Sequence, residues 1–90
     1  MKLEIEPYVA CCSLKVFKIN GINADYHDFG HQEDVDEANA PDYGCGNMQF
    51  ISKHATQDVL DKYDITVEDY NEILNELDRC LSFGYCAWCS

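Results

Sequence analysis

Cysteines are the side chains of this 90-residue chain with the most evident chemistry, and there are six of them. The sequence Cys86-Ala-Trp-Cys89 has a spacing that lets two thiolates converge on one tetrahedral zinc ion. A second such pair is missing, so the other ligands would come singly, from Cys45 between two glycines and from Cys11 or Cys12. Neighbouring residues of an extended segment point to opposite faces, so we expect only one of the last two to bind. These residues predict a structural zinc site that ties distant parts of the chain together.

The cysteines also allow other interpretations. Unligated thiols or a disulfide are the alternatives to a metal for Cys45, Cys86 and Cys89. A Cys-x2-Cys pair also serves thiol–disulfide exchange, where a helix N-terminus lowers the pKa of the first thiol. Here the pair follows a predicted helix and no βαβ pattern surrounds it, so the context gives a redox protein little support. Cys80 lies beside the apolar stripe of that helix, and we expect it to be a small buried hydrophobe.

Carboxylates dominate the charge, since 17 Asp and Glu stand against six Lys and Arg and the formal charge is −11. No base lies between Lys18 and Lys53, and the eight carboxylates from Asp58 to Asp78 are accompanied only by Lys62. Charge segregated in this way repels itself in a compact domain, so it destabilises folding and calls for a function. Phosphates would be repelled as well, which argues against direct binding of DNA, RNA or an anionic membrane. A basic protein surface or a cation is the partner that this charge predicts.

Two smaller groups of polar residues offer weaker chemistry. The acids and histidines of residues 25–31 could assist hydrolysis as metal ligands or acid–base groups. His27 and His31 are four residues apart, which aligns two imidazoles only on a helix, whereas this segment is expected to be strand and loop. The segment from Asp34 begins like a calcium loop, but it has Ala38 at its fifth position and Cys45 at its twelfth. No complete catalytic motif is present, and this favours a protein that is not an enzyme.

The N-terminal third predicts an antiparallel β-hairpin. Two apolar runs, Ser13 to Ile19 and Ile22 to Phe29, are separated by Asn20-Gly21, the residues that a type I′ turn favours. Apolar and acidic residues alternate from Leu3 to Glu6, which suggests a further short strand before Pro7. The acids of the second run are therefore expected on an exposed strand.

The middle of the chain is expected to be a long loop. From Gly30 to Asn47 the composition turns to Asp, Glu, Gly, Asn and Pro, with a helical turn expected near residues 33–38. Such a loop in a compact domain is usually functional or held by a metal. The apolar residues from Met48 to Ile51 predict another strand.

The C-terminal half predicts two helices. Ala55, Val59 and Tyr63 recur every four residues and mark a short first helix. Thr66 is the expected N-cap of the second, and Asp69 approximates the far residue of a capping box. The second helix carries one apolar stripe and ends near Gly84. The stripe consists of Tyr70, Ile73, Leu74, Leu77 and Leu81.

Length and the N-terminal sequence indicate one domain, residues 1–90, with neither a signal peptide nor a membrane-spanning stretch. We therefore expect a cytoplasmic protein, in a compartment where most thiols stay reduced. The predicted fold is α+β: an N-terminal antiparallel β-hairpin or three-stranded sheet packs against a C-terminal pair of helices and is pinned by a cysteine-ligated zinc.

The predicted function is that of a non-enzymatic acidic module that occupies a basic, nucleic-acid-binding surface of another protein, as a nucleic-acid mimic or inhibitor. In charge and size the chain is similar to small acidic anti-defence proteins of mobile elements, including anti-CRISPR proteins, although no motif identifies such a family. The expected contact residues are Asp25, Asp28, Glu33, Asp34, Asp36 and Glu37, with Glu68, Glu72 and Glu76 as a second patch.

Two other functions are open on the same sequence. A small zinc-binding adaptor would recognise its partner through aromatic residues, chiefly Trp88 and Tyr85, rather than through charge. A thiol–disulfide redox protein would use Cys86 and Cys89.

Overall fold

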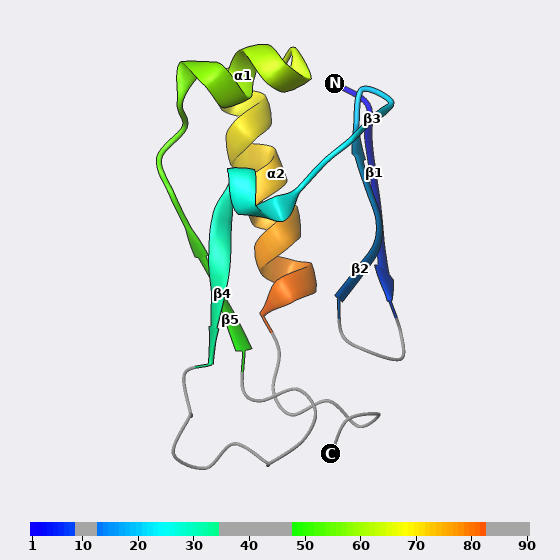
Figure 1. The fold of residues 1–90 in the computed structure, drawn as a ribbon, viewed down its shortest axis with the longest axis vertical. Helices are drawn as coiled ribbons and strands as arrows, with labels where there is room; N and C mark the ends of the chain where they lie inside the picture. Colours follow the sequence, from blue (N-terminus) through cyan, green and yellow to red (C-terminus); the bar gives the residue numbers. More distant parts are fainter. Residues whose placement is uncertain (9–12, 35–47, 83–90) are drawn as a thin grey trace.

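The computed structural model describes residues 1–8, 13–34 and 48–82, and in these residues it has two antiparallel sheets and two α-helices (Figure 1). The chain is therefore α+β, as the sequence predicts. The elements in chain order are β1 (Leu3–Tyr8), β2 (Ser13–Ile19), β3 (Ile22–Asn23), the 3₁₀ helix η1 (Tyr26–Asp28), β4 (Gly30–Asp34), β5 (Met48–Ser52), α1 (Gln57–Tyr63) and α2 (Val67–Leu81).

The first sheet has the strand order β1-β2-β3, and its hairpin turn is the predicted one. Asn20 and Gly21 have φ values of 52° and 78°, the two positive angles that a type I′ turn requires. The prediction of a second strand running to Phe29 is wrong, because β3 ends at Asn23. The alternation of apolar residues after the turn therefore does not reflect a strand.

A β-bulge shapes β2. The pairing between β1 and β2 shifts where Glu6 lies opposite Val16 and Pro7 lies opposite Leu14, so Lys15 is an extra residue in β2. Because of this extra residue, the side chains that precede it in β2 point to the opposite face from the one that strict alternation would give them. Leu14 can therefore pack against the core on the same side as Phe17, although the two residues are three apart.

Asp25 explains why the chain leaves the sheet after β3. Its backbone is extended, and its side chain accepts a hydrogen bond from the backbone N–H of His27, so it caps η1. The following residues also differ from the prediction of a loop with a helical turn, because Gly30–Asp34 forms β4 and pairs with β5. A Cβ at Gly30 would collide with the carbonyl oxygen of Ile51, so this pairing depends on glycine. The rest of the expected loop, residues 35–47, lies outside the described residues.

Both predicted helices are present, and local capping sets where each begins. Thr66 accepts a hydrogen bond from the N–H of Asp69, whose carboxylate in turn accepts from the N–H of Thr66, which completes the capping box. Thr56 caps α1 in a similar way. The second helix ends at Leu81, before the expected stop at Gly84, which the structure does not describe. Among the described residues, neither helix combines the length and the apolar character needed to cross a membrane.

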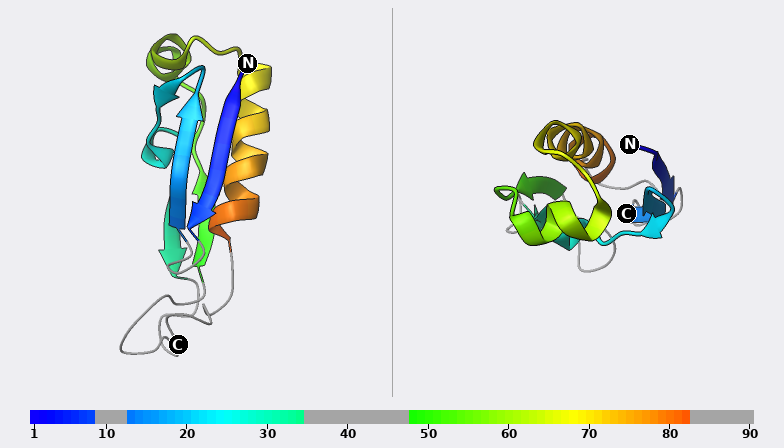
Figure 2. Two further views of the ribbon diagram at one scale, coloured as in Figure 1. Left: turned by 90° about the vertical axis from the view of Figure 1, so that its right-hand side faces the viewer. Right: turned by 90° about the horizontal axis from the view of Figure 1, so that it is seen from above.

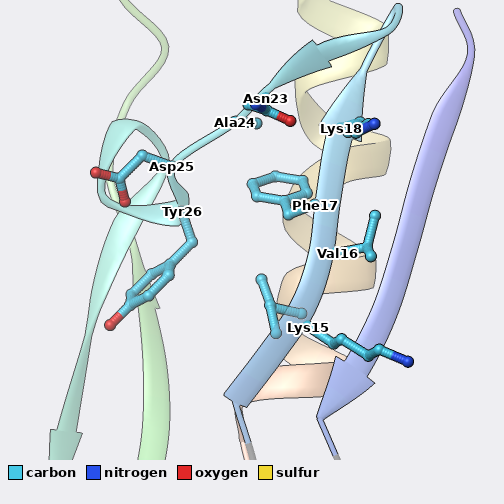
Figure 3. A pocket seen from close by; sticks show the side chains of 9 residues that line it. Lys15, Val16, Phe17, Lys18, Asn23, Ala24, Asp25 and Tyr26 are labelled. Carbon is cyan, nitrogen blue, oxygen red and sulfur yellow. The ribbon is translucent and has the colours of Figure 1, made fainter.

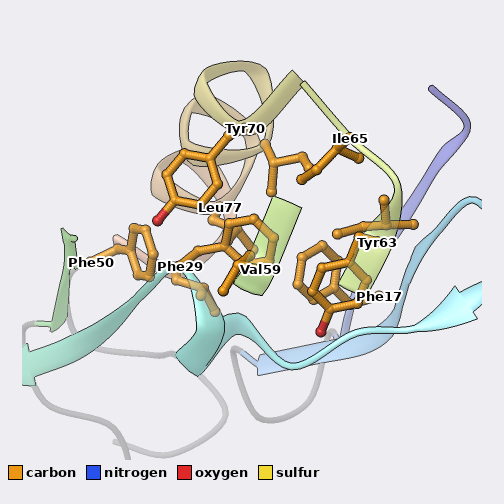
Figure 4. Packing of buried hydrophobic residues seen from close by; sticks show 11 residues of the cluster. Phe17, Phe29, Phe50, Val59, Tyr63, Ile65, Tyr70 and Leu77 are labelled. Atoms are coloured by element: carbon orange, nitrogen blue, oxygen red, sulfur yellow. The ribbon is translucent and has the colours of Figure 1, made fainter. Parts of the chain in front are cut away.

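The core lies where α2 meets both sheets. In Figures 1 and 2, α2 runs lengthwise between β4–β5 on one side and β1–β2 on the other, and α1 crosses one end. The aromatic ring of Phe29, which is fully buried, lies at the centre of this contact. Its centroid is 5.0 Å from that of Tyr70, 5.7 Å from that of Tyr63 and 5.9 Å from that of Phe17 (Figure 4). A chain of this size has one modest core. Phe29 is the C-cap of η1, so this short helix places its ring in the core.

Asn20 provides a test of how the hairpin is held against α1. Its amide donates to the carbonyls of Tyr63 (2.8 Å) and Asp64 (3.2 Å), and its carbonyl accepts from the backbone N–H of Lys2 (2.9 Å). Asn20→Gly keeps the positive φ and loses these bonds, so we expect the free energy of unfolding to fall by about 1–3 kcal/mol. Asn20→Ala adds the strain of a left-handed residue and should cost roughly 1–2 kcal/mol more.

Urea unfolding monitored by circular dichroism measures both changes. Asn75→Ala, at an exposed position of α2, is the control and should leave stability nearly unchanged. Equal stability of the wild type, Asn20→Gly and Asn20→Ala would contradict this account of the turn.

Candidate functional site

The candidate site is a set of carboxylates, and the structure separates those that have a structural task from those that do not. Asp25 belongs to the first group. Besides capping η1, its carboxylate lies 2.7 Å from Nδ1 of His27. The hydrogen bond from the backbone N–H of His27, helped by the His27 ring, holds the pKa of Asp25 below its ordinary value. Asp25 is exposed, but its charge is already partly satisfied within the chain.

Asp28 is the carboxylate most firmly tied to the fold. Its Oδ2 accepts hydrogen bonds from the Tyr63 hydroxyl (2.5 Å) and from Nζ of Lys62 (2.8 Å), and only 25% of its side chain is exposed. Partial burial raises the pKa of Asp28, but the bonds from Lys62 and Tyr63 outweigh burial and bring the pKa below its ordinary value. Burial, together with the same contact, raises the pKa of Tyr63. Asp28 therefore joins η1 to α1. Because its carboxylate is already bonded to Lys62 and Tyr63, it is less available to a partner protein.

The third described acid of the base-free stretch, Glu33, lies on β4 beside His31, with 2.9 Å between its Oε1 and Nε2 of the ring. The two histidines thus form separate pairs with acids two residues away, and His27 stacks on the ring of Tyr26. In the part of the chain that the structure describes, no three His, Cys, Asp or Glu side chains come together as a metal site would need.

A second group of acids lies on the helices and has no basic partner among the described residues, although Asp61 accepts a hydrogen bond from Nε2 of Gln57 (2.8 Å). It consists of Asp58, Asp61, Asp64 and Glu68, here called the acidic corner. These residues are exposed, and no Lys or Arg of the described residues forms an ion pair with them. They belong to α1, its C-cap and the first turn of α2, which lie at the same end of the molecule (Figure 1).

The acidic corner differs from the surface that the sequence emphasised. Asp58, Asp61 and Asp64 were visible in the sequence as part of an acidic block, but their spacing alone does not show that their charges are unpaired. Glu68 and Glu72 are exposed as expected, whereas Glu76 pairs with Arg79 one turn later.

The two acidic patches that the sequence predicts, one around η1 and one along α2, do not form one continuous surface in the described residues. Both views of Figure 2 place η1, which carries Asp25 and Asp28, and α2, which carries Glu68 and Glu72, on opposite sides of the molecule. The part of the acidic corner on α1 is the part nearer to η1, because Asp28 bonds to Lys62 and Tyr63 of α1.

Two hollows adjoin the first sheet. One, of about 390 Å³, lies between β2 and η1, with Phe17 and Tyr26 on facing walls, while Lys15 and Lys18 point away from Tyr26 (Figure 3). The other, of about 400 Å³, lies between β1 and α2, where Glu72 and Glu76 are close to the apolar side chains of β1.

Several predicted site residues lie outside the described residues. They are Cys11, Cys12, Cys45, Cys86, Cys89, Asp36, Glu37 and Trp88, and the side chain of Asp34. The zinc site, the aromatic adaptor and the redox pair therefore stay predictions. Cys80 is described: it is partly buried against the core, as expected, and burial raises the pKa of its thiol.

Comparison of the chain with protein-family models, with curated proteins and with solved structures gave no match. The assignment of a function therefore depends on the chemistry of the surfaces described above.

The contact between Asp28 and Tyr63 predicts a pH-dependent contribution to stability. Because the pKa of Asp28 in the folded state is below its ordinary value of 3.8, this contribution is fully present above that pH and is lost as the pH falls through the folded-state pKa. At neutral pH, Asp28→Asn should lower the free energy of unfolding by about 1–3 kcal/mol. The difference from the wild type should shrink below about pH 4.

Denaturant unfolding across this pH range measures the effect. Asp58→Asn, which removes the charge of an exposed carboxylate at the acidic corner, is the control and should change stability little. A difference between Asp28→Asn and wild type that stays constant from neutral pH to about pH 2 would show that the ionised carboxylate is not the stabilising species.

Proposed function

We propose that this chain is a non-enzymatic protein-binding module whose carboxylates engage a basic, nucleic-acid-binding surface of another protein. The observation that carries the proposal is the acidic corner. It presents exposed carboxylates that no Lys or Arg of the described residues neutralises, although all six bases of the chain are among those residues. Its role would be that of a nucleic-acid mimic or inhibitor, and the chain itself would not bind nucleic acid.

Repulsion among the like charges of the acidic corner supports a role in binding a basic partner. Asp58 and Asp61 are three residues apart on α1, and Glu68 and Glu72 are four apart on α2, so both pairs of like charges are neighbours on a helix. Repulsion within each such pair is worth roughly 0.2–0.5 kcal/mol. It is offset in part because Asp58 and Glu68 lie in the first turns of their helices, where a negative charge is favourable. A basic partner would remove this repulsion on binding, and the net charge of −11 would accelerate its approach at low salt.

The short side chain of Asp suits this role. Ten of the 17 acids are Asp, which hold the charge close to a fixed backbone position and lose little side-chain entropy on binding. In the acidic corner, three of the four residues are Asp, and Asp64 is itself held in a left-handed conformation with φ of 53°. The acidic corner therefore presents its charges from fixed backbone positions on α1, its C-cap and α2.

A cysteine-bound zinc in a cytoplasmic, thiol-reducing compartment is the second part of the proposal. The segments that carry the five predicted ligands are flanked by described residues at one end of the molecule: the turn end of β1 and β2, the matching end of β4 and β5, and the end of α2 (Figure 1). The last two are in contact, since Gln32 donates to the carbonyl of Leu81 (2.9 Å) and the N–H of Phe50 to the Ser82 hydroxyl (3.0 Å). This arrangement supports a shared metal without requiring the chain to cross the molecule.

Neutralising the acidic corner tests the proposed function. Affinity capture from a lysate of the native host, with mass spectrometry of the bound fraction, should enrich basic nucleic-acid-binding proteins. Raising the salt from about 50 mM to about 500 mM should release them. The triple variant Asp58→Asn, Asp61→Asn and Asp64→Asn should weaken binding of the captured partner by roughly tenfold or more.

The matched control removes the same number of charges from carboxylates that already have partners: Asp25→Asn, Glu33→Gln and Asp78→Asn. This control should retain most of the affinity. If the captured partner stayed bound at high salt, binding would not depend on charge. If both triple variants lost affinity equally, the acidic corner would not be the binding surface.

Native mass spectrometry tests the zinc. The purified chain should carry one zinc ion that a chelator removes, and removal should lower the melting temperature. Cys86→Ser should abolish zinc binding, whereas Cys80→Ser, which changes a core-packed thiol, should not. A chain that is metal-free and equally stable with and without chelator would show that zinc does not pin this fold.

A further inference from the structure

Among the described residues, β1 has one free edge, and this edge carries backbone groups without partners. In the first sheet β1 is an edge strand, and among the described residues only β2 pairs with it. The carbonyl of Lys2 accepts from the N–H of Asn20 (2.7 Å), which fixes which residues of β1 point toward β2. Antiparallel pairing alternates, so the N–H and C=O groups of Leu3 and Ile5 point away from the sheet. They are a template for one more strand.

A hollow beside this edge is lined by both apolar and charged side chains. Its volume is about 400 Å³, and it is lined by Met1, Leu3, Ile5, Glu72, Glu76 and Arg79. The strand contributes apolar side chains and the helix contributes acids. Within the described residues Arg79 pairs with Glu76, whereas Glu72 is exposed and has no ion pair. The hollow therefore combines an apolar wall with a carboxylate that lacks a cation.

We propose that an extended, basic segment of the partner protein adds to β1 as a further strand and places a Lys or Arg side chain between β1 and α2. The main chain of the segment would hydrogen-bond to Leu3 and Ile5. The aliphatic part of its Lys or Arg would pack on those two side chains, and the charged end would reach Glu72. This inference rests on the proposed function, because it specifies how a basic partner engages the chain.

Charge and sequence limit the alternatives for this edge. Pairing of β1 with β1 of a second copy would bring Glu4 and Glu6 of both chains together, and each chain has a net charge of −11. Pro7 has no N–H to offer, so a docked strand would pair over Leu3 and Ile5 only. The other edge of the sheet is the two-residue strand β3, which pairs with Lys18 and Ile19 of β2. The rest of β2 contains the bulge at Lys15, a feature that discourages strand addition.

A synthetic peptide of alternating lysine and valine is the probe for this inference. At low salt it should bind the full chain and slow amide hydrogen exchange at Leu3 and Ile5, measured by NMR. The same peptide N-methylated on every backbone nitrogen keeps its charge but can form the ladder through neither edge, and it should not produce this protection. Glu72→Gln should weaken binding roughly threefold to fivefold. Asp78→Asn, which removes a charge from the side of α2 that faces β5, should change it much less.

The outcomes separate this inference from the proposed function. If the peptide binds without protecting Leu3 and Ile5, or if the N-methylated peptide binds equally well, the strand-addition inference is wrong while capture by the acidic corner can still hold. Protection of Leu3 and Ile5 in the absence of peptide, together with a dimer in sedimentation, would show that a second copy occupies the edge. Failure of the peptide to bind at low salt would also overturn the inference.

Discussion

The apolar stripe of α2 is the constraint on which the rest of the structure depends. It must be covered on two sides, and the chain does this with two small sheets rather than with the single sheet that a hairpin would provide. Phe29 completes the contact, and its placement requires the chain to leave the first sheet at Asp25 and to start the second at Gly30. The positions of the acidic residues follow from this arrangement, because α2, η1 and α1 each have one face on the core and must expose the other.

Some of the carboxylates of this molecule therefore stabilise the fold, and others are exposed and available to a partner. Asp25 and Asp28 carry charge that shapes η1 and ties it to α1, and their lowered pKa values reflect that use. The acidic corner carries charge that nothing among the described residues neutralises. Repulsion between its like charges is worth tenths of a kcal/mol per pair and is only partly offset by the helix N-termini near Asp58 and Glu68. The exposed charge without a basic partner is the physical reason to regard the corner as the surface that meets a partner.

Local signals were enough to predict some elements. The turn at Asn20-Gly21 and the second helix were predictable because a positive-φ turn and a capping box with a 3.6-residue stripe are encoded by neighbours in sequence. The strand β4 was not, since Gly30–Asp34 is polar and pairs with a strand that lies 14 or more residues further along. The pairing of Asp28 with Tyr63, across 35 residues, is likewise a tertiary contact with no local signature. The acidity of the site could be predicted, but which acids are unpaired could not.

Competition with nucleic acid tests the central claim most directly. Fluorescence anisotropy of a labelled oligonucleotide bound to the captured partner would be followed as this chain is added. The account predicts that the chain displaces the oligonucleotide and that the Asp58, Asp61 and Asp64 triple variant does so much less effectively. A ternary complex, in which the partner holds this chain and the oligonucleotide at the same time with undiminished affinity, would contradict it.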